Sequence, residues 1–176
     1  MLGRIAAAWG LVGVCLFLAS AIFKLAIISW QLVAIELELY HWLVMLLWVL
    51  FMGYYEGYQG FQKGFSPRVA ARIYFLVENV TYKRLLLAPL FCMGFFDAER
   101  RRIIFIICLS IGIILLVQVV EHMPMPWRGI MDVGVVVGLS WGLISMLVFT
   151  LKAFFSPDFN YSAEVPNRQL RAVAGK

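Results

Sequence analysis

Four stretches of mostly apolar residues divide the chain, and the shorter segments between them carry most of the charge. The stretches cover residues 5–23, 40–55, 103–120 and 133–154. Because about 30 Å of hydrocarbon needs about 20 helical residues, the pattern predicts an all-α integral membrane protein with four transmembrane helices. Residues 1–155 then form a single membrane domain, followed by a polar cytoplasmic tail over residues 156–176.

The segment between the second and third stretches carries two weaker signals. Ser66 and Pro67 are typical of a helix start, as N-cap and first helical residue. Basic and apolar positions then recur with helical spacing, so we expect an amphipathic helix over about residues 67–84 that lies on an anionic membrane surface. The apolar run that follows, residues 85–96, is too short to cross and contains Pro89. Such runs are interfacial, re-entrant or packed against other helices.

Composition and charge assign the chain to a membrane and orient it there. Of its residues 63% are hydrophobic and 14% are charged, and the mean hydropathy is +0.88, unlike the composition of soluble domains. With a cytoplasmic N-terminus, thirteen of the fifteen Lys and Arg residues lie on the cytoplasmic side, as the positive-inside rule requires. Only Lys24 and Arg128 then face outward. We therefore expect both termini inside, in a bacterial inner membrane.

The net charge of +5 indicates anionic phospholipid as the partner rather than nucleic acid, because the basic residues flank apolar helices. The expected headgroup contacts come from the amphipathic helix and from the start of the third span. They are Arg68, Arg72, Lys83, Arg84, Arg100, Arg101 and Arg102.

Two stripes of glycine recur at helical spacing. The first comprises Gly53, Gly57, Gly60 and Gly64, and the second comprises Gly134, Gly138 and Gly142. Small residues let helices approach closely in lipid, so both stripes predict helix-packing faces, within one chain or between copies of it. Packing within the chain is the favoured interpretation. The first stripe also has an alternative as an aromatic and glycine-rich loop, because each glycine costs a helix about 1 kcal/mol.

Glu56 lies beside the first glycine stripe, near the inner end of the second span. A carboxylate at membrane depth is costly unless it is paired. The favoured interpretation is an ion pair with Lys63, Arg68 or Arg72, and the alternative is a proton or substrate site.

Both histidines fall on the outer side together with several carboxylates. The candidate metal ligands are His41, His122, Glu38 and Glu121. This donor set suits Zn²⁺, Cu²⁺ or Fe²⁺, and the two histidines are also candidate axial ligands of haem. Their spacing matches no ligand motif, so ordinary solvated loop residues are the favoured interpretation and no cofactor is predicted.

The chain contains no motif of catalysis or nucleotide binding. The leading hypothesis is a non-catalytic accessory, assembly or scaffold subunit that contacts a membrane-protein partner, or a second copy of itself, and anionic lipid. One alternative is a small oligomeric transporter or channel with Glu56 on its path. A second alternative is a membrane-bound metal or haem enzyme, acting in redox chemistry or lipid modification through His41 and His122.

Overall fold

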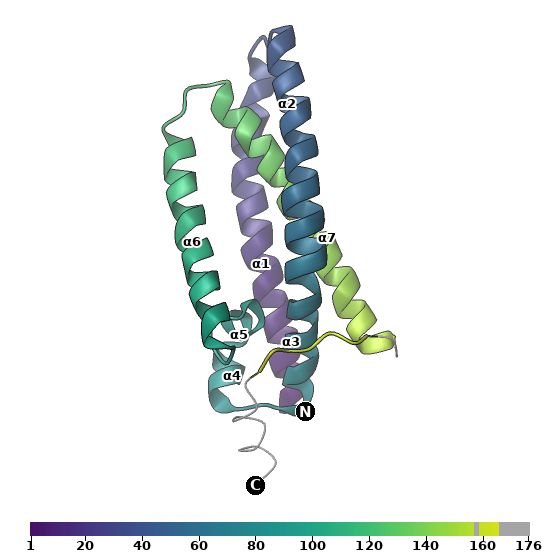
Figure 1. The fold of residues 1–176 in the computed structure, drawn as a ribbon. Coiled ribbons are helices and arrows are strands. Elements are labelled where there is room, and N and C mark those ends of the chain that lie inside the picture. The colour runs from purple at the N-terminus through teal and green to yellow at the C-terminus, as the bar shows by residue number, and fades with distance from the viewer. Residues whose placement is uncertain (157–158, 166–176) are drawn as a thin grey trace.

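The computed structural model describes residues 1–156 and 159–165, and every regular element within them is helical. Figure 1 shows long helices running side by side, with short helices gathered at one end. The elements are α1 (Leu2–Trp30), η1 (Gln31–Ala34), α2 (Leu39–Met52), η2 (Gly53–Phe65), α3 (Ser66–Glu78), α4 (Tyr82–Leu86), α5 (Ala88–Met93), α6 (Arg100–Glu121) and α7 (Trp127–Phe155). Three of the described helices are long and apolar enough to cross a membrane: α1 extended by η1, α6, and α7.

The first helix runs without a break past Lys24 and tightens into the 3₁₀ turn η1. Its buried residues recur three or four positions apart, which is the spacing of a single helix face. They are Gly3, Ala6, Ala7, Gly10, Val14 and Leu18. This mostly small face packs against α3, α5 and α7, so α1 forms one wall of the core.

The helix of the second predicted span continues past residue 55 through the first glycine stripe, as the spacing of those glycines indicates. It also runs on into α3, so that α2, η2 and α3 form one uninterrupted helical path from Leu39 to Glu78, seen in Figure 1 as a single long column. Its middle part, η2, is a π-helix, in which backbone hydrogen bonds span five residues instead of four. As expected, α3 begins at Ser66 with Pro67 in its first turn. Ser66 is not an N-cap, however, because η2 leads directly into it and its backbone is already helical, with φ −59° and ψ −45°. Pro67, which has no N–H to donate, stands where the π-helical pattern returns to α-helical.

The predicted amphipathic helix is part of the core. Residues 67–84 divide into α3 and α4, separated where the backbone leaves the helical region at Asn79. Val69, Ile73 and Leu76 are almost completely buried, because α3 packs between α1 and α7. An apolar stripe beside basic residues therefore marks a packed helix here, and the apolar face of α3 is covered by α1 and α7.

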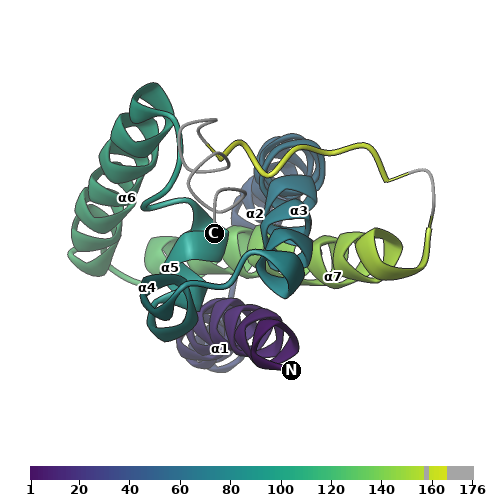
Figure 2. The same ribbon diagram turned by 90° about the horizontal axis from the view of Figure 1, so that it is seen from below.

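The short apolar element is packed in the same region. It folds as α4 and α5, and Ala88, Phe91 and Cys92 are fully buried against α1 and α3. Figure 2, viewed from the end of the molecule, shows α4 and α5 beside α1. Gly94 ends α5 with φ +89°, a left-handed conformation that favours glycine.

The last two long helices differ in their surroundings. α7 crosses the bundle obliquely (Figure 1) and packs against α1, α2, η2 and α3. α6 stands apart on one side and makes only a small contact with α7. The N-terminus, α4 and α5 lie at one end of the molecule, and η1 and the loop between α6 and α7 lie at the other.

Candidate functional site

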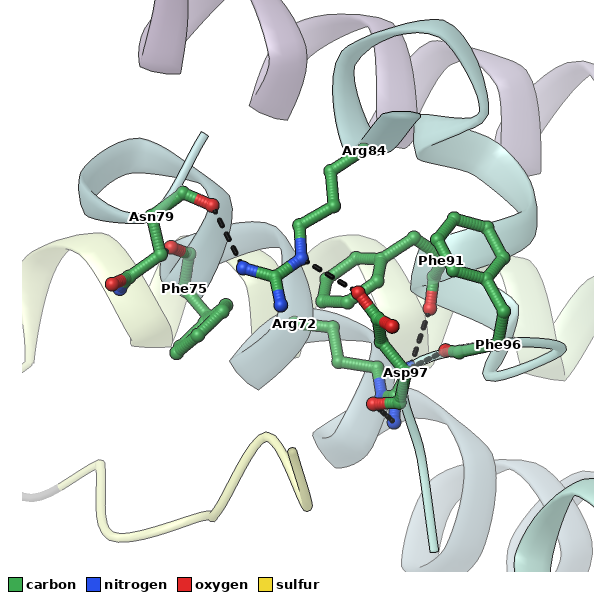
Figure 3. Close-up of polar contacts among 7 residues, drawn as sticks. All are labelled: Arg72, Phe75, Asn79, Arg84, Phe91, Phe96 and Asp97. Atoms are coloured by element: carbon green, nitrogen blue, oxygen red, sulfur yellow. Dashed lines mark hydrogen bonds and ion pairs between the residues drawn. The ribbon is translucent and has the colours of Figure 1, made fainter. Parts of the chain in front are cut away.

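Two clusters of polar side chains lie inside the described part of the chain. The first, here called the arginine cluster, consists of Arg72, Arg84 and Asp97 and is drawn in Figure 3. Arg72 projects from α3 and is only 3% exposed. Its Nη1 donates to the carbonyl oxygens of Phe91 (2.8 Å) and Phe96 (3.3 Å), and its Nη2 donates to the carbonyl of Asp97 (3.3 Å). The guanidinium thus ties α3 to the end of α5 and to the turn that follows it, where the Phe91 carbonyl also accepts the Gly94 N–H at 3.0 Å.

Arg84 completes the cluster from α4 and is 4% exposed. Its Nε donates to the Asp97 carboxylate at 2.8 Å, and its Nη1 donates to the Asn79 carbonyl at 3.1 Å. The Phe91 ring lies against both guanidinium groups, with its centroid 5.0 Å from Arg72 Cζ and 5.4 Å from Arg84 Cζ. Buried cations are tolerated when they are paired and hydrogen-bonded in this way.

The arginine cluster holds the base of α6, meaning residues 97–102. Asp97 has φ 53°, a left-handed conformation that Asp adopts more readily than most residues, and it lies three residues before α6 begins. A second link joins the same base to α3, because Glu164 pairs with Arg68 at 3.5 Å and with Arg102 at 3.2 Å. This link is partly exposed and is therefore the weaker one.

These contacts change the interpretation of the basic residues. Arg72 and Arg84 cannot serve lipid headgroups, because both are buried and bonded to the chain itself. Arg68 and Arg102 share Glu164. Three of the predicted headgroup residues stay exposed, namely Lys83, Arg100 and Arg101.

The electrostatics of the cluster oppose chemistry at Cys92. Burial raises the pKa of Cys92 to about 12, although Arg72 acts in the opposite direction. A thiol in this state is a poor nucleophile, because the thiolate is the reactive form. The arginine cluster therefore has the chemistry of a structural site.

The second cluster follows the interface between η2 and α7. Trp141 Nε1 donates to Gln62 Oε1 at 2.8 Å. The hydroxyls of Ser66 and Ser145 lie 2.7 Å apart. At the far end Trp48 Nε1 donates to a carbonyl of α7 at 3.1 Å. Hydrogen bonds of this kind join helices within a bilayer.

Three of the four glycines of α7, those of the second glycine stripe, make room for large side chains of the neighbouring helix. Gly134 faces the Trp48 ring, and Gly142 faces the Phe61 ring. Gly138 faces the carboxylate of Glu56, whose Oε2 would lie 2.7 Å from an added Cβ. The second glycine stripe is therefore in contact with the chain's own side chains.

The first glycine stripe is not one continuous face. Gly57 lies against Trp141, 3.0 Å from an added Cβ. The nearest atoms to Gly60 and Gly64 are carbonyls of their own helix. The four residues were expected to share a face on an α-helix. The π-helical pattern of η2 holds more residues in each turn and rotates the later glycines away.

Glu56 has no ionic partner among the described residues, since no Lys, Arg or His nitrogen lies within 4.0 Å of its carboxylate. The expected partners all point elsewhere. Lys63 lies over the Tyr58 ring, 4.6 Å from its centroid, while Arg68 pairs with Glu164 and Arg72 binds backbone carbonyls. Glu56 Oε2 is buried and accepts no hydrogen bond.

The candidate metal ligands do not come together. His41 is buried, and its Nδ1 accepts a hydrogen bond from the Glu38 backbone N–H at 3.3 Å. His122 is exposed, and its Nδ1 lies 2.7 Å from the carbonyl oxygen of Gln118. Within the described residues there is no group of three or more His, Cys, Asp or Glu side chains that could hold a metal ion. The metal hypothesis therefore has no assembled site there.

The chain matches no model of a known protein family, no curated protein and no solved structure. Its function must therefore be argued from its own contacts.

Proposed function

We propose that the chain is a non-catalytic accessory or scaffold subunit of a membrane complex, and that α6 is the helix that binds its partner. In this proposal α6 crosses the membrane with its base on the cytoplasmic side, and the continuous helix of α2, η2 and α3 supplies the fourth span. The exposed Lys83, Arg100 and Arg101 lie at the level of anionic headgroups.

The observation that carries the proposal is the exposure of α6. None of its 22 residues is buried, whereas α1 and α7 each bury one face in the core. Lipid can cover an apolar helix without cost, because acyl chains are as apolar as Leu. Exposure alone therefore supports only the assignment of α6 as a membrane helix. Binding of α6 to a protein partner must be supported by polar groups or surface shapes that acyl chains cannot match.

Two features of α6 supply that support. Gln118 is exposed and is the only polar side chain in residues 111–120 of α6, and that side chain makes no hydrogen bond within the described residues. An amide facing hydrocarbon without a hydrogen-bond partner costs free energy, and a neighbouring helix can provide one. The other feature is a shallow apolar groove, lined by Phe105, Cys108, Leu109, Gly112, Ile113 and Leu116.

Gly112 lies in the middle of this groove. No heavy atom of the described residues lies within 4 Å of the position that a Cβ would occupy there, so the described part of the chain does not require glycine at this position. A small residue allows the backbone of a second helix to approach closely. The groove thus fits a transmembrane helix of a partner protein.

The base of α6 supports the same role. Arg84 and Asp97 fix the segment that leads into α6, and Glu164 joins Arg102 to α3. α6 is held firmly at one end and is free along its length, as expected of an element that presents a surface to another protein.

The proposal is tested by filling the groove. Gly112→Leu should leave the fold intact and remove the complex seen on native gels after extraction of membranes with mild detergent. The matched control is Ile114→Phe, which adds bulk about 200° around the same helix. Loss of the larger species in the Gly112 variant alone supports the proposal, and a complex of unchanged size in both variants contradicts it.

A further inference from the structure

Glu56 has an environment that neither packing nor a scaffold role explains. Its carboxylate lies against Gly138, which is the twelfth of the 29 residues of α7 and therefore near the middle of a helix long enough to span the membrane. The sequence alone places Glu56 at the inner boundary instead. The longer helix formed by α2, η2 and α3 carries it to this depth.

The charged groups on the surrounding elements are distant or already engaged. On α7 they are Arg128, Asp132 and Lys152, of which Asp132 is closest to Gly138, about 9 Å along the helix axis. On η2 itself Lys63 lies over the Tyr58 ring, and Tyr54 accepts a hydrogen bond from Gln59. Neither the histidine of α2 nor the arginines of α3 come within 4.0 Å of the carboxylate.

A carboxylate without a cation, with one oxygen buried and no hydrogen bond to that oxygen, is costly inside a bilayer. Protonation removes the charge and most of that cost. The side chain is only partly buried by the described residues, so the chain itself does not fully enclose the carboxyl group. π-helical segments such as η2 also recur at functional sites.

We propose that Glu56 is a proton-binding site within the membrane, carrying an exchangeable proton at neutral pH. Gly138 provides the space for the carboxyl group, because an added Cβ would lie 2.7 Å from Oε2. The site does not depend on binding of a partner by α6, so either proposal can fail without the other.

Modification by dicyclohexylcarbodiimide tests this directly, because the reaction consumes the carboxyl proton. The carboxyl oxygen bonds to the central carbon of the reagent, the proton moves to a reagent nitrogen, and an acyl shift gives a stable N-acylurea without a leaving group. The peptide that contains Glu56 should therefore gain the mass of one whole reagent molecule in membranes at pH 7. The yield should fall about tenfold per pH unit once the group ionises.

The carboxylates that are paired in the structure serve as internal controls. Asp97 and Glu164, which bind arginines, should stay unmodified under the same conditions. Infrared spectra supply a second readout that does not depend on access of the reagent. The wild type should show the carbonyl stretch of a protonated carboxyl group. Glu56→Gln should lose the component of this band that belongs to Glu56. Asp132→Asn should keep that component and should lose only a band of Asp132, where there is one.

The infrared component assigned to Glu56, or modification of Glu56 in the wild type, supports the proposal. It is overturned if Glu56 is unmodified at pH 7 and the spectra of the wild type and Glu56→Gln have the same protonated-carboxyl bands. It is also overturned if Glu56 is modified only at acidic pH, as expected of a solvated carboxylate.

Discussion

α6 and α7 are both long, apolar helices, yet one is packed inside the bundle and the other is exposed along its length. α7 buries residues along its whole length, from Gly129 to Ala153, whereas α6 buries none. Hydrophobicity does not separate the two helices, because both satisfy the requirements for a membrane span. They differ in their small residues. α7 has three glycines spaced four apart on the face that receives Trp48, Glu56 and Phe61, and α6 has only Gly112.

The comparison shows what drives helix packing in lipid. An apolar side chain gains little when it moves from acyl chains to another helix, so close approach and hydrogen bonds decide which faces are buried. α7 approaches its neighbours closely and forms hydrogen bonds with them, including the contact between Ser145 and Ser66. Along most of its length α6 has no such close approach or hydrogen bond to another described helix. Its position depends on the arginine cluster and Glu164 at its base.

The largest effect is expected from breaking the arginine cluster beneath α6. Arg84→Met removes the guanidinium whose Nε lies 2.8 Å from the partly buried Asp97 carboxylate, and should destabilise the protein by about 3 kcal/mol. The measurement is unfolding in mixed detergent micelles, with Asp97→Asn in the Arg84→Met background as the control. Restored stability in the double variant supports the ion pair. Equal stability of Arg84→Met and the wild type contradicts it.

A smaller effect is expected from overpacking α7. Gly142→Leu forces a side chain against the Phe61 ring, which lies 2.5 Å from an added Cβ, and should cost about 2 kcal/mol. Gly112→Leu in α6 meets no neighbouring atom and should leave stability unchanged in the same assay. An equal loss of unfolding free energy in Gly142→Leu and Gly112→Leu would show that α6 and α7 do not differ in how tightly they pack within the chain.

The third effect concerns Cys92, which is buried near the base of α6. Its pKa is raised to about 12 in the folded chain from an ordinary value of 9.0, so the unfolded thiol ionises first as the pH rises. Unfolding then releases a proton, and stability should fall by about 1.4 kcal/mol between pH 8 and pH 10. Chemical unfolding at both pH values should show this difference relative to Cys92→Ala. A pH-independent gap between the two proteins argues against a buried thiol.

The positions of three long helices could be predicted from sequence, because an apolar run of sufficient length has few other structures available to it. Residues 103–120 and 133–154 fall within α6 and α7, and residues 5–23 fall within α1. The helical spacing of the glycines predicts a helix as far as residue 64, whereas the join to α3 could not be predicted, because Ser66 and Pro67 are local signals of a new helix start. Packing against α7 outweighs them in the folded chain.

The candidate sites were harder to predict for a related reason. The positions of Arg72 and Arg84 in the sequence fit a surface helix as well as a core helix. Nothing local shows that the carbonyl of Phe91, 19 residues beyond Arg72, accepts its hydrogen bond. The expected partners of Glu56 are close in sequence, but Lys63 lies over Tyr58 of its own helix, and Arg68 and Arg72 bind groups that the fold brings near. Pairing of buried charges depends on tertiary contacts that spacing alone does not reveal.

Photocrosslinking along α6 tests the proposed partner-binding role most directly. A benzophenone side chain is introduced in turn at Phe105, Leu109 and Leu116 in the groove, and at Ile107, Ile111 and Ile114 on the rest of the helix. In native membranes the groove positions should give one crosslinked product of constant mass, and the other positions should give crosslinks to lipid alone. Equal crosslinking to lipid at all six positions would contradict the account.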